Sequence, residues 1–294
     1  MSDKTDMSDK SDAKSVLEHS SLGQSVDYDA GYDPDLLFAI PRAPGRQQLG
    51  LSGELPFDGC DIWNAYELSW LHPSGKPAVA WAELRVPALS PNIVESKSLK
   101  LYLNSLNQMR FDSAEAVAAA IRRDVSACVV ADVEVHVRLP ALWSAFPIEE
   151  PAGDCLDELD ITVAAYTPCP ELLQLVSGPV SDQVSDQLVT RRWFSRLLRS
   201  RCPVTGQPDW GTICIDYRGR EIDPAGLLAY IVSFRQHQDF HEHCVERVFC
   251  DIHQQCAPDA LTVSARYLRR GGIDINPWRS TEPVLASNPR LFQQ

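Results

Sequence analysis

A repeated pattern of amphipathic helices is the feature of this sequence that most constrains its fold. Two segments place apolar residues at i, i+3, i+4 and i+7, which is the spacing of a helix with one buried face. The apolar positions are Leu99, Tyr102, Leu103 and Leu106 in one segment and Leu227, Tyr230, Ile231 and Phe234 in the other. The two sets lie 128 residues apart, and this shared offset indicates an internal repeat.

A second helix is expected after each of these two. Asp112 with Glu115, and Asp239 with Glu242, have the spacing of a capping pair at a helix N-terminus. Asp223 followed by a proline predicts the start of the first helix of the second pair.

Strands are predicted on both sides of the helices. Segments 133–139, 213–217 and 261–267 alternate apolar and polar residues, which is typical of half-buried and usually antiparallel strands. The order strand, helix, helix, strand therefore occurs twice. The sequence predicts an α+β fold made of two similar modules.

The composition of the connecting segments suggests where the modules begin and end. We expect a disordered polar tail over 1–25. An N-terminal module over 26–150 and a C-terminal module over 186–294 are joined by a linker over 151–185, which is acidic and rich in turn formers.

Charge and hydropathy exclude several classes of protein. The net charge of −13 argues against the nucleic-acid backbone as a partner. No apolar run reaches the about 18 residues of a membrane span, and the N-terminus lacks the apolar core of a signal peptide. The nine cysteines are odd in number and irregularly spaced, which favours free thiols in a reducing cytoplasm over a disulfide framework.

The segment CPVTGQPD (202–209) is a candidate catalytic turn. Its prolines and glycine predict a rigid turn that brings Asp209 towards Cys202. A thiolate beside a carboxylic acid suits addition to an electrophilic carbon. A basic cluster upstream is expected to favour the thiolate, and it consists of Arg191, Arg192, Arg196, Arg199 and Arg201. A structural cysteine in a loop would have the same local sequence.

Two further segments resemble phosphate sites. Ser96 and Lys97 begin a predicted helix within VESKSLK (94–100), and Arg270 and Gly271 lie in RRGGIDINP (269–277). A solvated helix cap and a basic turn explain the same residues equally well. No GxGxxG motif follows a predicted strand, so a Rossmann cofactor site is not supported.

The segment DFHEHC (239–244) places His241 beside Glu242 at a helix start. This pair is suited to binding the edge of a purine and moving a proton; helix capping by Glu242 and a solvated His241 are the alternatives. Nitrogen and sulfur ligands are frequent nearby, at His241, His243, Cys244, Cys250, His253 and Cys256. Because this stretch is predicted to be one continuous helix without a Cys-x-x-Cys pair, we expect no metal site.

Taken together, these motifs resemble the bacterial NADPH-dependent 7-cyano-7-deazaguanine reductases, the nitrile reductases of queuosine biosynthesis, in their long two-module form. The matching stretches are VESKSLKLYLNSLNQ (94–108), CPVTGQPDWGTICIDY (202–217), FRQHQDFHEHCV (234–245) and RRGGIDINPWRS (269–280). LGQSVDYDAGYDPDLL near the N-terminus is also similar, so the resemblance extends over nearly all of the chain beyond about residue 22.

The resemblance implies a fold and a set of partners. It implies two fused tunnelling-fold (T-fold) modules, each an antiparallel sheet with a helix pair on one face. It implies a cytoplasmic homodimer that takes a small deazapurine substrate and NADPH, with no metal, no flavin, no direct nucleic-acid contact and no membrane contact.

The resemblance also implies a role for each motif residue. Cys202 matches the nucleophile that forms a thioimidate with the nitrile carbon, and Asp209 matches the proton donor. His241 matches a catalytic and substrate-binding residue. The remaining substrate contacts would be Val94, Glu95, Ser96 and Glu242, and the NADPH contacts would be Ser96, Lys97, Arg270 and Gly271.

The implied reaction reduces the nitrile to a primary amine with two molecules of NADPH, through the Cys202 thioimidate and then an imine. Two other functions remain open from the residues. One is a zinc-dependent enzyme of the same fold acting on a pterin or on GTP, and the other is a non-catalytic purine-binding protein.

Overall fold

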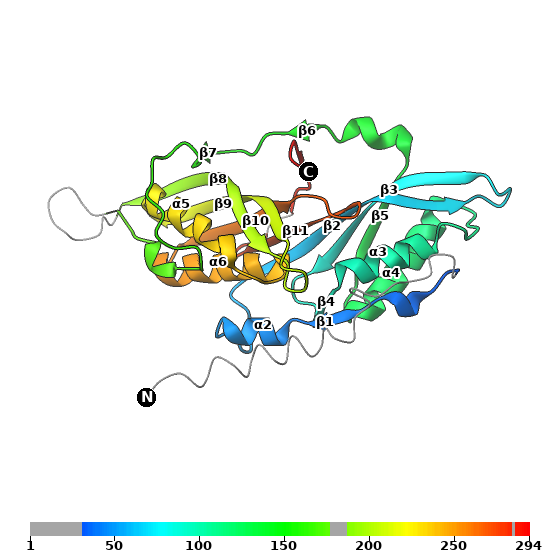
Figure 1. The fold of residues 1–294 in the computed structure, drawn as a ribbon, viewed down its shortest axis with the longest axis horizontal. Helices are drawn as coiled ribbons and strands as arrows, with labels where there is room; N and C mark the ends of the chain where they lie inside the picture. Colours follow the sequence, from blue (N-terminus) through cyan, green and yellow to red (C-terminus); the bar gives the residue numbers. More distant parts are fainter. Residues whose placement is uncertain (1–30, 177–186, 284–285) are drawn as a thin grey trace. The chain divides into compact units, whose positions relative to one another are not determined.

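The computed structural model describes residues 31–176, 187–283 and 286–294, and its parts are drawn in Figure 1. The expected tail over 1–25 lies outside these residues. The chain divides into two compact units. The first unit contains residues up to 48, 64–143 and 271–273, and the second contains 49–63, 144–270 and 274–294. The fold is mixed α+β with mainly antiparallel strand pairing, as expected.

The first unit carries three strands in the order β5-β3-β2 and a short antiparallel pair, β1 with β4. Helix α4 packs against β5. Its elements are η1 (Pro34–Leu36), β1 (Ala39–Pro41), α2 (Ala43–Gln48), β3 (Pro77–Pro87), β4 (Asn92–Val94), α3 (Ser96–Ser105), α4 (Ala114–Val129) and β5 (Glu134–Arg138). The strand β2 (Asp58–Leu71) belongs to this unit from Asn64 onward.

The second unit has the strand order β11-β10-β9-β8-β7, with helices α5 and α6 against β8 and β10 respectively (Figure 1). Its larger elements are β8 (Leu188–Arg201), β9 (Pro208–Arg220), α5 (Pro224–Ser233), α6 (His241–Cys256), β10 (Ala260–Tyr267) and β11 (Ile273–Ser280). The smaller ones are β6 (Ile148–Glu149), β7 (Asp154–Cys155), η3 (Pro170–Leu172), η4 (Phe234–Gln236) and β12 (Arg290–Leu291), while η2 (Pro140–Ala145) lies where the chain passes between the units.

The two predicted helix pairs are present, and in each pair a buried Tyr–Asp hydrogen bond joins the two helices. The Tyr102 hydroxyl of α3 donates to Asp124 of α4 over 2.6 Å. The Tyr230 hydroxyl of α5 donates to Asp251 of α6, also over 2.6 Å. In each pair the second helix ends on a left-handed residue, Val130 or Ala257. The offset seen in the sequence is therefore accompanied by matching local structure.

The helix starts agree only in part with the sequence prediction. Asp223 caps α5, as expected: its carboxylate accepts hydrogen bonds from the backbone N–H groups of Ala225 and Gly226. The two predicted capping pairs are wrong. Helix α4 is capped by the hydroxyl of Ser113, and α6 begins after Phe240, which has no capping side chain. Asp239 instead bonds to the ring of His243, 3.1 Å away.

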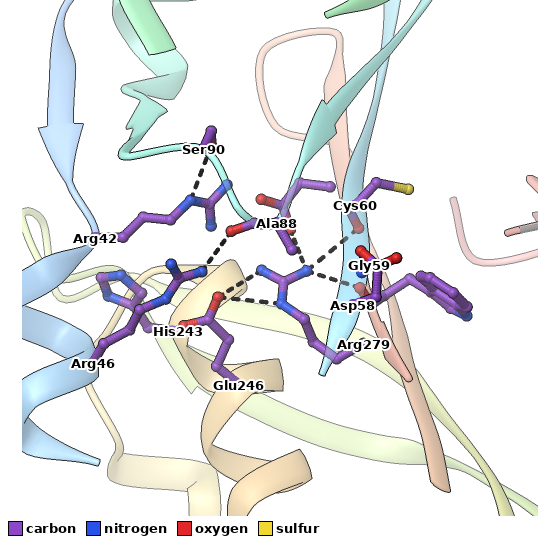
Figure 2. Close-up of polar contacts among 12 residues, drawn as sticks. Arg42, Arg46, Asp58, Gly59, Cys60, Ala88, Ser90, His243, Glu246 and Arg279 are labelled. Atoms are coloured by element: carbon purple, nitrogen blue, oxygen red, sulfur yellow. Dashed lines mark hydrogen bonds and ion pairs between the residues drawn. The ribbon is translucent and has the colours of Figure 1, made fainter. Parts of the chain in front are cut away.

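A fully buried ionic cluster ties α6 to the strands of the second unit (Figure 2). Arg279 of β11 donates to Glu246 over 2.9 Å and to Asp61 over 2.8 Å, and it also reaches the carbonyl of Cys60. Isolated charges are very costly to bury, so this arrangement is stable only because each charge has an opposite partner. The cluster fixes the position of α6, whose first turn carries His241 and Glu242.

The described part of the chain contains no helix long and apolar enough to cross a membrane.

Candidate functional site

Cys202 lies in the tight turn that joins β8 to β9. Its N–H donates to the carbonyl of Gln207 over 2.9 Å, and its own carbonyl accepts from Gly206 over 3.0 Å. Gly206 has a φ of +67°, a backbone conformation that favours glycine. The strand register pairs Ser200 with Asp209, so Asp209 is the second residue of β9 and lies just beyond the turn. The predicted turn is therefore present.

The register of β10 against β9 brings Arg270 to the same end of the sheet. Tyr267 pairs with Gly211, and the chain continues past Leu268, whose N–H donates to the carbonyl of Trp210. The Arg270 guanidinium then reaches back across the sheet. One of its nitrogens bonds to Oδ1 of Asp209 over 2.6 Å, and the other bonds to Oε1 of Gln207 over 2.6 Å.

Asp209 is buried, with 4 % of its surface exposed, and it carries a cationic or polar partner on each oxygen. Arg270 bonds to Oδ1, and Nε2 of His241 lies 3.4 Å from Oδ2. Burial by itself raises the pKa of Asp209, but the hydrogen bonds and charges of His241 and Arg270 outweigh it and hold the pKa below its ordinary value. Asp209 is therefore a carboxylate at neutral pH and is able to accept a proton.

The first turn of α6 is tied to the turn that carries Cys202. Arg201 exchanges backbone hydrogen bonds with His237 and Asp239, and the side-chain amide of Gln238 donates to the carbonyl of Cys202 over 3.1 Å. This pairing places His241 beside Asp209. Glu242, the next residue, is 1 % exposed.

The imidazole of His241 is held from two sides. Its ring stacks on Tyr267 with the centroids 3.8 Å apart, and Nε2 faces Asp209. Its Nδ1 is buried and has no hydrogen-bond partner among the residues that the structure describes. A buried nitrogen of this kind is available to a ligand.

Four of the five arginines upstream of Cys202 have partners away from the thiol. Arg191, Arg192 and Arg196 of β8 pair with Glu221, Asp216 and Glu150. Arg199 lies over the ring of Trp210. Arg270 is a further arginine near this turn: it bonds to Asp209, and Asp209 and then Cys202 raise its pKa.

The other predicted site residues lie in the first unit, at the start of α3. Val94 ends β4 and is buried. Glu95 is the N-cap of α3, and its carboxylate accepts from the N–H groups of Lys97 and Ser98 over 2.9 and 2.8 Å. Ser96 is exposed and donates to the same carboxylate. The N–H groups expected to bind a phosphate are thus occupied by Glu95.

Gly271 approaches the same helix closely. It has a φ of +60°, and a Cβ added there would lie 3.1 Å from Cδ of Lys100. Lys100 lies one turn after Lys97 on α3, and its ammonium is 3.3 Å from Glu67. Lys97, Lys100 and Gly271 therefore form a small basic surface in the first unit.

The first unit has a turn similar to that of Cys202 but without the reactive groups. The backbone N–H of His72 donates to the carbonyl of Lys76, and the carbonyl of His72 accepts from the N–H of Gly75. The backbone of Cys202 makes the same two kinds of bond, with Gln207 and Gly206. Histidine takes the place of the thiol in this turn. The candidate nucleophile Cys202 and its neighbouring carboxylate Asp209 thus both lie in the second unit.

The sequence did not identify three residues that shape the site: Gln207, Gln238 and Tyr267. Gln207 lies within the predicted turn, but only the strand register shows that it binds Arg270. Tyr267 is the last residue of β10, in which apolar and polar residues alternate, and the pattern predicts only an ordinary core residue there. Nothing in the sequence indicates its stacking on His241.

The described residues form neither a disulfide nor a candidate metal centre. All nine cysteines lie within the described ranges and are free thiols. Across those ranges no three side chains of His, Cys, Asp or Glu are grouped so that they could hold a metal ion.

Comparison with known proteins places the chain in a family. Residues 28–137 match the family described as nitrile reductase, 7-cyano-7-deazaguanine-reductase N-term, and residues 208–284 match the QueF-like protein family. A protein of Bordetella avium named NADPH-dependent 7-cyano-7-deazaguanine reductase is 54% identical over 264 residues, covering 90% of this chain and 94% of that protein. A protein of Chromobacterium violaceum with the same name is 53% identical over 279 residues, covering 94% and 97%.

Among solved structures, the apo form of the archaeosine synthase QueF-Like matches 34% of this chain and 99% of its own, with 16% identity and a TM-score of 0.30. The assignment rests on the sequence relatives, which are similar over almost their full length. The chain belongs to the family of NADPH-dependent 7-cyano-7-deazaguanine reductases.

Proposed function

We propose that this protein reduces the nitrile of 7-cyano-7-deazaguanine to the primary amine of 7-aminomethyl-7-deazaguanine, with NADPH as reductant, in queuosine biosynthesis. The names of relatives 53–54% identical to it support this reaction. The observation that carries the chemistry is the position of Asp209, which is ionised between Arg270 and His241 at the end of the turn that bears Cys202.

In the first step the Cys202 thiol adds to the nitrile carbon. The sulfur electron pair forms the S–C bond, and one C–N π bond breaks. Asp209 accepts the thiol proton and delivers it to the nitrile nitrogen, which gives a neutral thioimidate. Because Asp209 is a carboxylate before the step and again after it, it acts as a proton shuttle and needs no external acid.

When bound, NADPH would supply a hydride to the former nitrile carbon in each of two reductions, and a proton would add to the nitrogen each time. Between the reductions Cys202 leaves as the electron pair of the amino nitrogen forms a C=N bond; the nitrogen gives up a proton and the sulfur takes one. The buried Asp209 and the half-buried His241 are suited to exchanging these protons without bulk water.

The basic surface of the first unit fits a phosphorylated cofactor. Gly271 presents its backbone next to Lys100 with no side chain in between, while Ser96 is exposed beside Lys97. Ser96, Lys97 and Gly271 are therefore proposed as NADPH contacts, together with Arg270, whose side chain is 40% exposed.

The substrate base is proposed to bind through Glu242 and His241. A carboxylate accepts hydrogen bonds from the amide and amino groups of a deazaguanine, and the free Nδ1 of His241 offers a further polar contact. Val94, Glu95 and Ser96 are the other proposed contacts. The Glu95 carboxylate already accepts from its own helix, so it is held in a fixed orientation.

We also propose the tandem tunnelling fold, a homodimer and a cytoplasmic location. The matching Tyr–Asp bonds of the two helix pairs support the repeat of modules. Nine free thiols suit a reducing compartment. The resemblance to the long family form supports the dimer, for which light scattering should give twice the chain mass of 32.7 kDa.

The reaction is tested by following NADPH consumption with 7-cyano-7-deazaguanine and quantifying the product. We expect two NADPH oxidised for each amine formed by the wild type, and no turnover by Cys202→Ala. A folded wild type that oxidises no NADPH but acts on a pterin or GTP when zinc is added would contradict the proposal.

A further inference from the structure

We propose that Arg270 is a positioning residue of the thiol-addition step, in which its guanidinium holds Asp209 in the orientation that takes the Cys202 thiol proton. This role rests on the proposed nitrile reduction and is separate from any contact that Arg270 makes with NADPH. It operates before hydride transfer, so it is observable without the cofactor.

The geometry around Arg270 connects both reacting groups. Its two terminal nitrogens bond to Asp209 and Gln207, each over 2.6 Å. Gln207 accepts the backbone N–H of Cys202 through its carbonyl. The guanidinium therefore bridges the first residues of β9 and the turn that holds the thiol. A rigid planar fork with two fixed partners is preorganised.

The charges around Asp209 are arranged in the same sense. Burial lowers the pKa of Arg270, but the attraction and hydrogen bonding of Asp209 are the largest of the effects that outweigh it and raise the pKa. Because attraction between two groups is mutual, the guanidinium favours the ionised form of Asp209 and helps to hold its pKa below the ordinary value. Three arginines of β8, namely Arg191, Arg192 and Arg196, pair with other carboxylates.

A cation beside Asp209 suits the proton transfer. Before the step the negative charge is on Asp209, and it passes to the sulfur as Asp209 takes the thiol proton. When the S–C bond has formed and the proton has gone to the nitrogen, Asp209 carries the charge again. Arg270 is bonded to Asp209, so the carboxylate has a cationic partner before the step and after it.

The test is single-turnover formation of the Cys202 adduct with 7-cyano-7-deazaguanine in the absence of NADPH, measured by intact-protein mass spectrometry. Arg270→Gln should form the adduct at least about tenfold more slowly than the wild type, and Arg270→Lys should recover part of the rate. The matched control is Arg218→Gln, also on β9, which removes an exposed ion pair to Glu282 and should keep the wild-type rate.

A second measurement is the pH dependence of the same adduct rate. Because Arg270 helps to hold the pKa of Asp209 below its ordinary value, the acid limb of the profile should lie at a higher pH in Arg270→Gln than in the wild type. An adduct rate and a pH profile equal to those of the wild type, with only a raised KM for NADPH, would overturn the proposal and leave Arg270 as a cofactor contact. A wild type that forms no adduct would instead overturn the proposed function, and this inference with it.

Discussion

The ring of His241 lies flat against the ring of Tyr267, with the centroids 3.8 Å apart and the planes inclined by 11°. Gly211, the strand partner of Tyr267, leaves space for the tyrosine ring, because a Cβ there would lie 3.2 Å from Cδ1 of the tyrosine. Tyr267 is completely buried, so its position is set by the core. The stack fixes the imidazole so that Nε2 faces Asp209.

Replacing Tyr267 should therefore affect catalysis through His241. Tyr267→Phe keeps the stack and should retain near wild-type kcat. Tyr267→Leu removes it, and the loss of a contact worth about 1 kcal/mol should lower kcat by about three- to tenfold. Steady-state kinetics measure the change in kcat, and thermal melting checks that the variants are folded to the same extent as the wild type. Equal kcat for the two variants would show that the stack does not position His241.

The pH dependence of stability should report the ionised state of Asp209. Its pKa lies below the ordinary value because His241 and Arg270 outweigh the effect of burial. The folded protein thus binds fewer protons here than the unfolded chain, and the stabilisation is complete above the unfolded pKa of about 3.9. It is lost as the pH falls through the lowered value.

Comparison with Asp209→Asn isolates this contribution. The wild type should melt at a higher temperature than the variant at pH 7, and the gap should narrow as the pH falls below about 4. A gap that widens towards low pH would mean that Asp209 is protonated, rather than ionised, in the folded protein.

Much of the fold was predictable because burial is one-sided. Helix α3 and strand β10 each place their apolar residues mainly on one face, which gives a clear period in the sequence. Strand β8 lacks this period because its register shifts between Ser195 and Leu198. Strand β2 lacks it because consecutive residues from Asp61 to Ala65 are all buried.

The candidate site could be proposed residue by residue, but its contacts could not be predicted. Cys202, Asp209, His241 and Glu242 stand out through turn chemistry and the family motifs. That Arg270 meets Asp209 depends on the register of β10 against β9, which no local pattern specifies. The same reason explains why the partners of Arg191, Arg192 and Arg196 were not foreseen: these arginines are near Cys202 in sequence but pair with carboxylates elsewhere.

The buried cluster of Arg279 should be a major source of stability. Arg279→Met leaves Glu246 and Asp61 buried without their cation, and should lower the free energy of unfolding by about 3–5 kcal/mol. The control is Arg122→Met, which breaks the exposed pair with Asp132 and should leave the urea midpoint nearly unchanged. Similar midpoints for both variants would contradict the importance of the buried cluster.

The two Tyr–Asp bonds should differ in strength despite their similar geometry. Asp124 accepts from Tyr102 and also from Arg123, at 2.9 Å. Asp251 accepts from Tyr230 inside the second unit, and burial raises its pKa. Tyr230→Phe should therefore cost about 1–3 kcal/mol of unfolding free energy and Tyr102→Phe less. Urea denaturation compares them, and a larger loss for Tyr102→Phe would refute this ranking.

The proposed mechanism begins with attack of Cys202 on the nitrile before any reduction occurs. This step is tested by intact-protein mass spectrometry of the wild type and of Cys202→Ala after incubation with 7-cyano-7-deazaguanine and no NADPH. We expect the wild type to gain the mass of one substrate molecule, peptide mapping to place it on Cys202, and the variant to gain nothing. An unmodified wild type, or an adduct that persists in Cys202→Ala, would show that Cys202 is not the nucleophile.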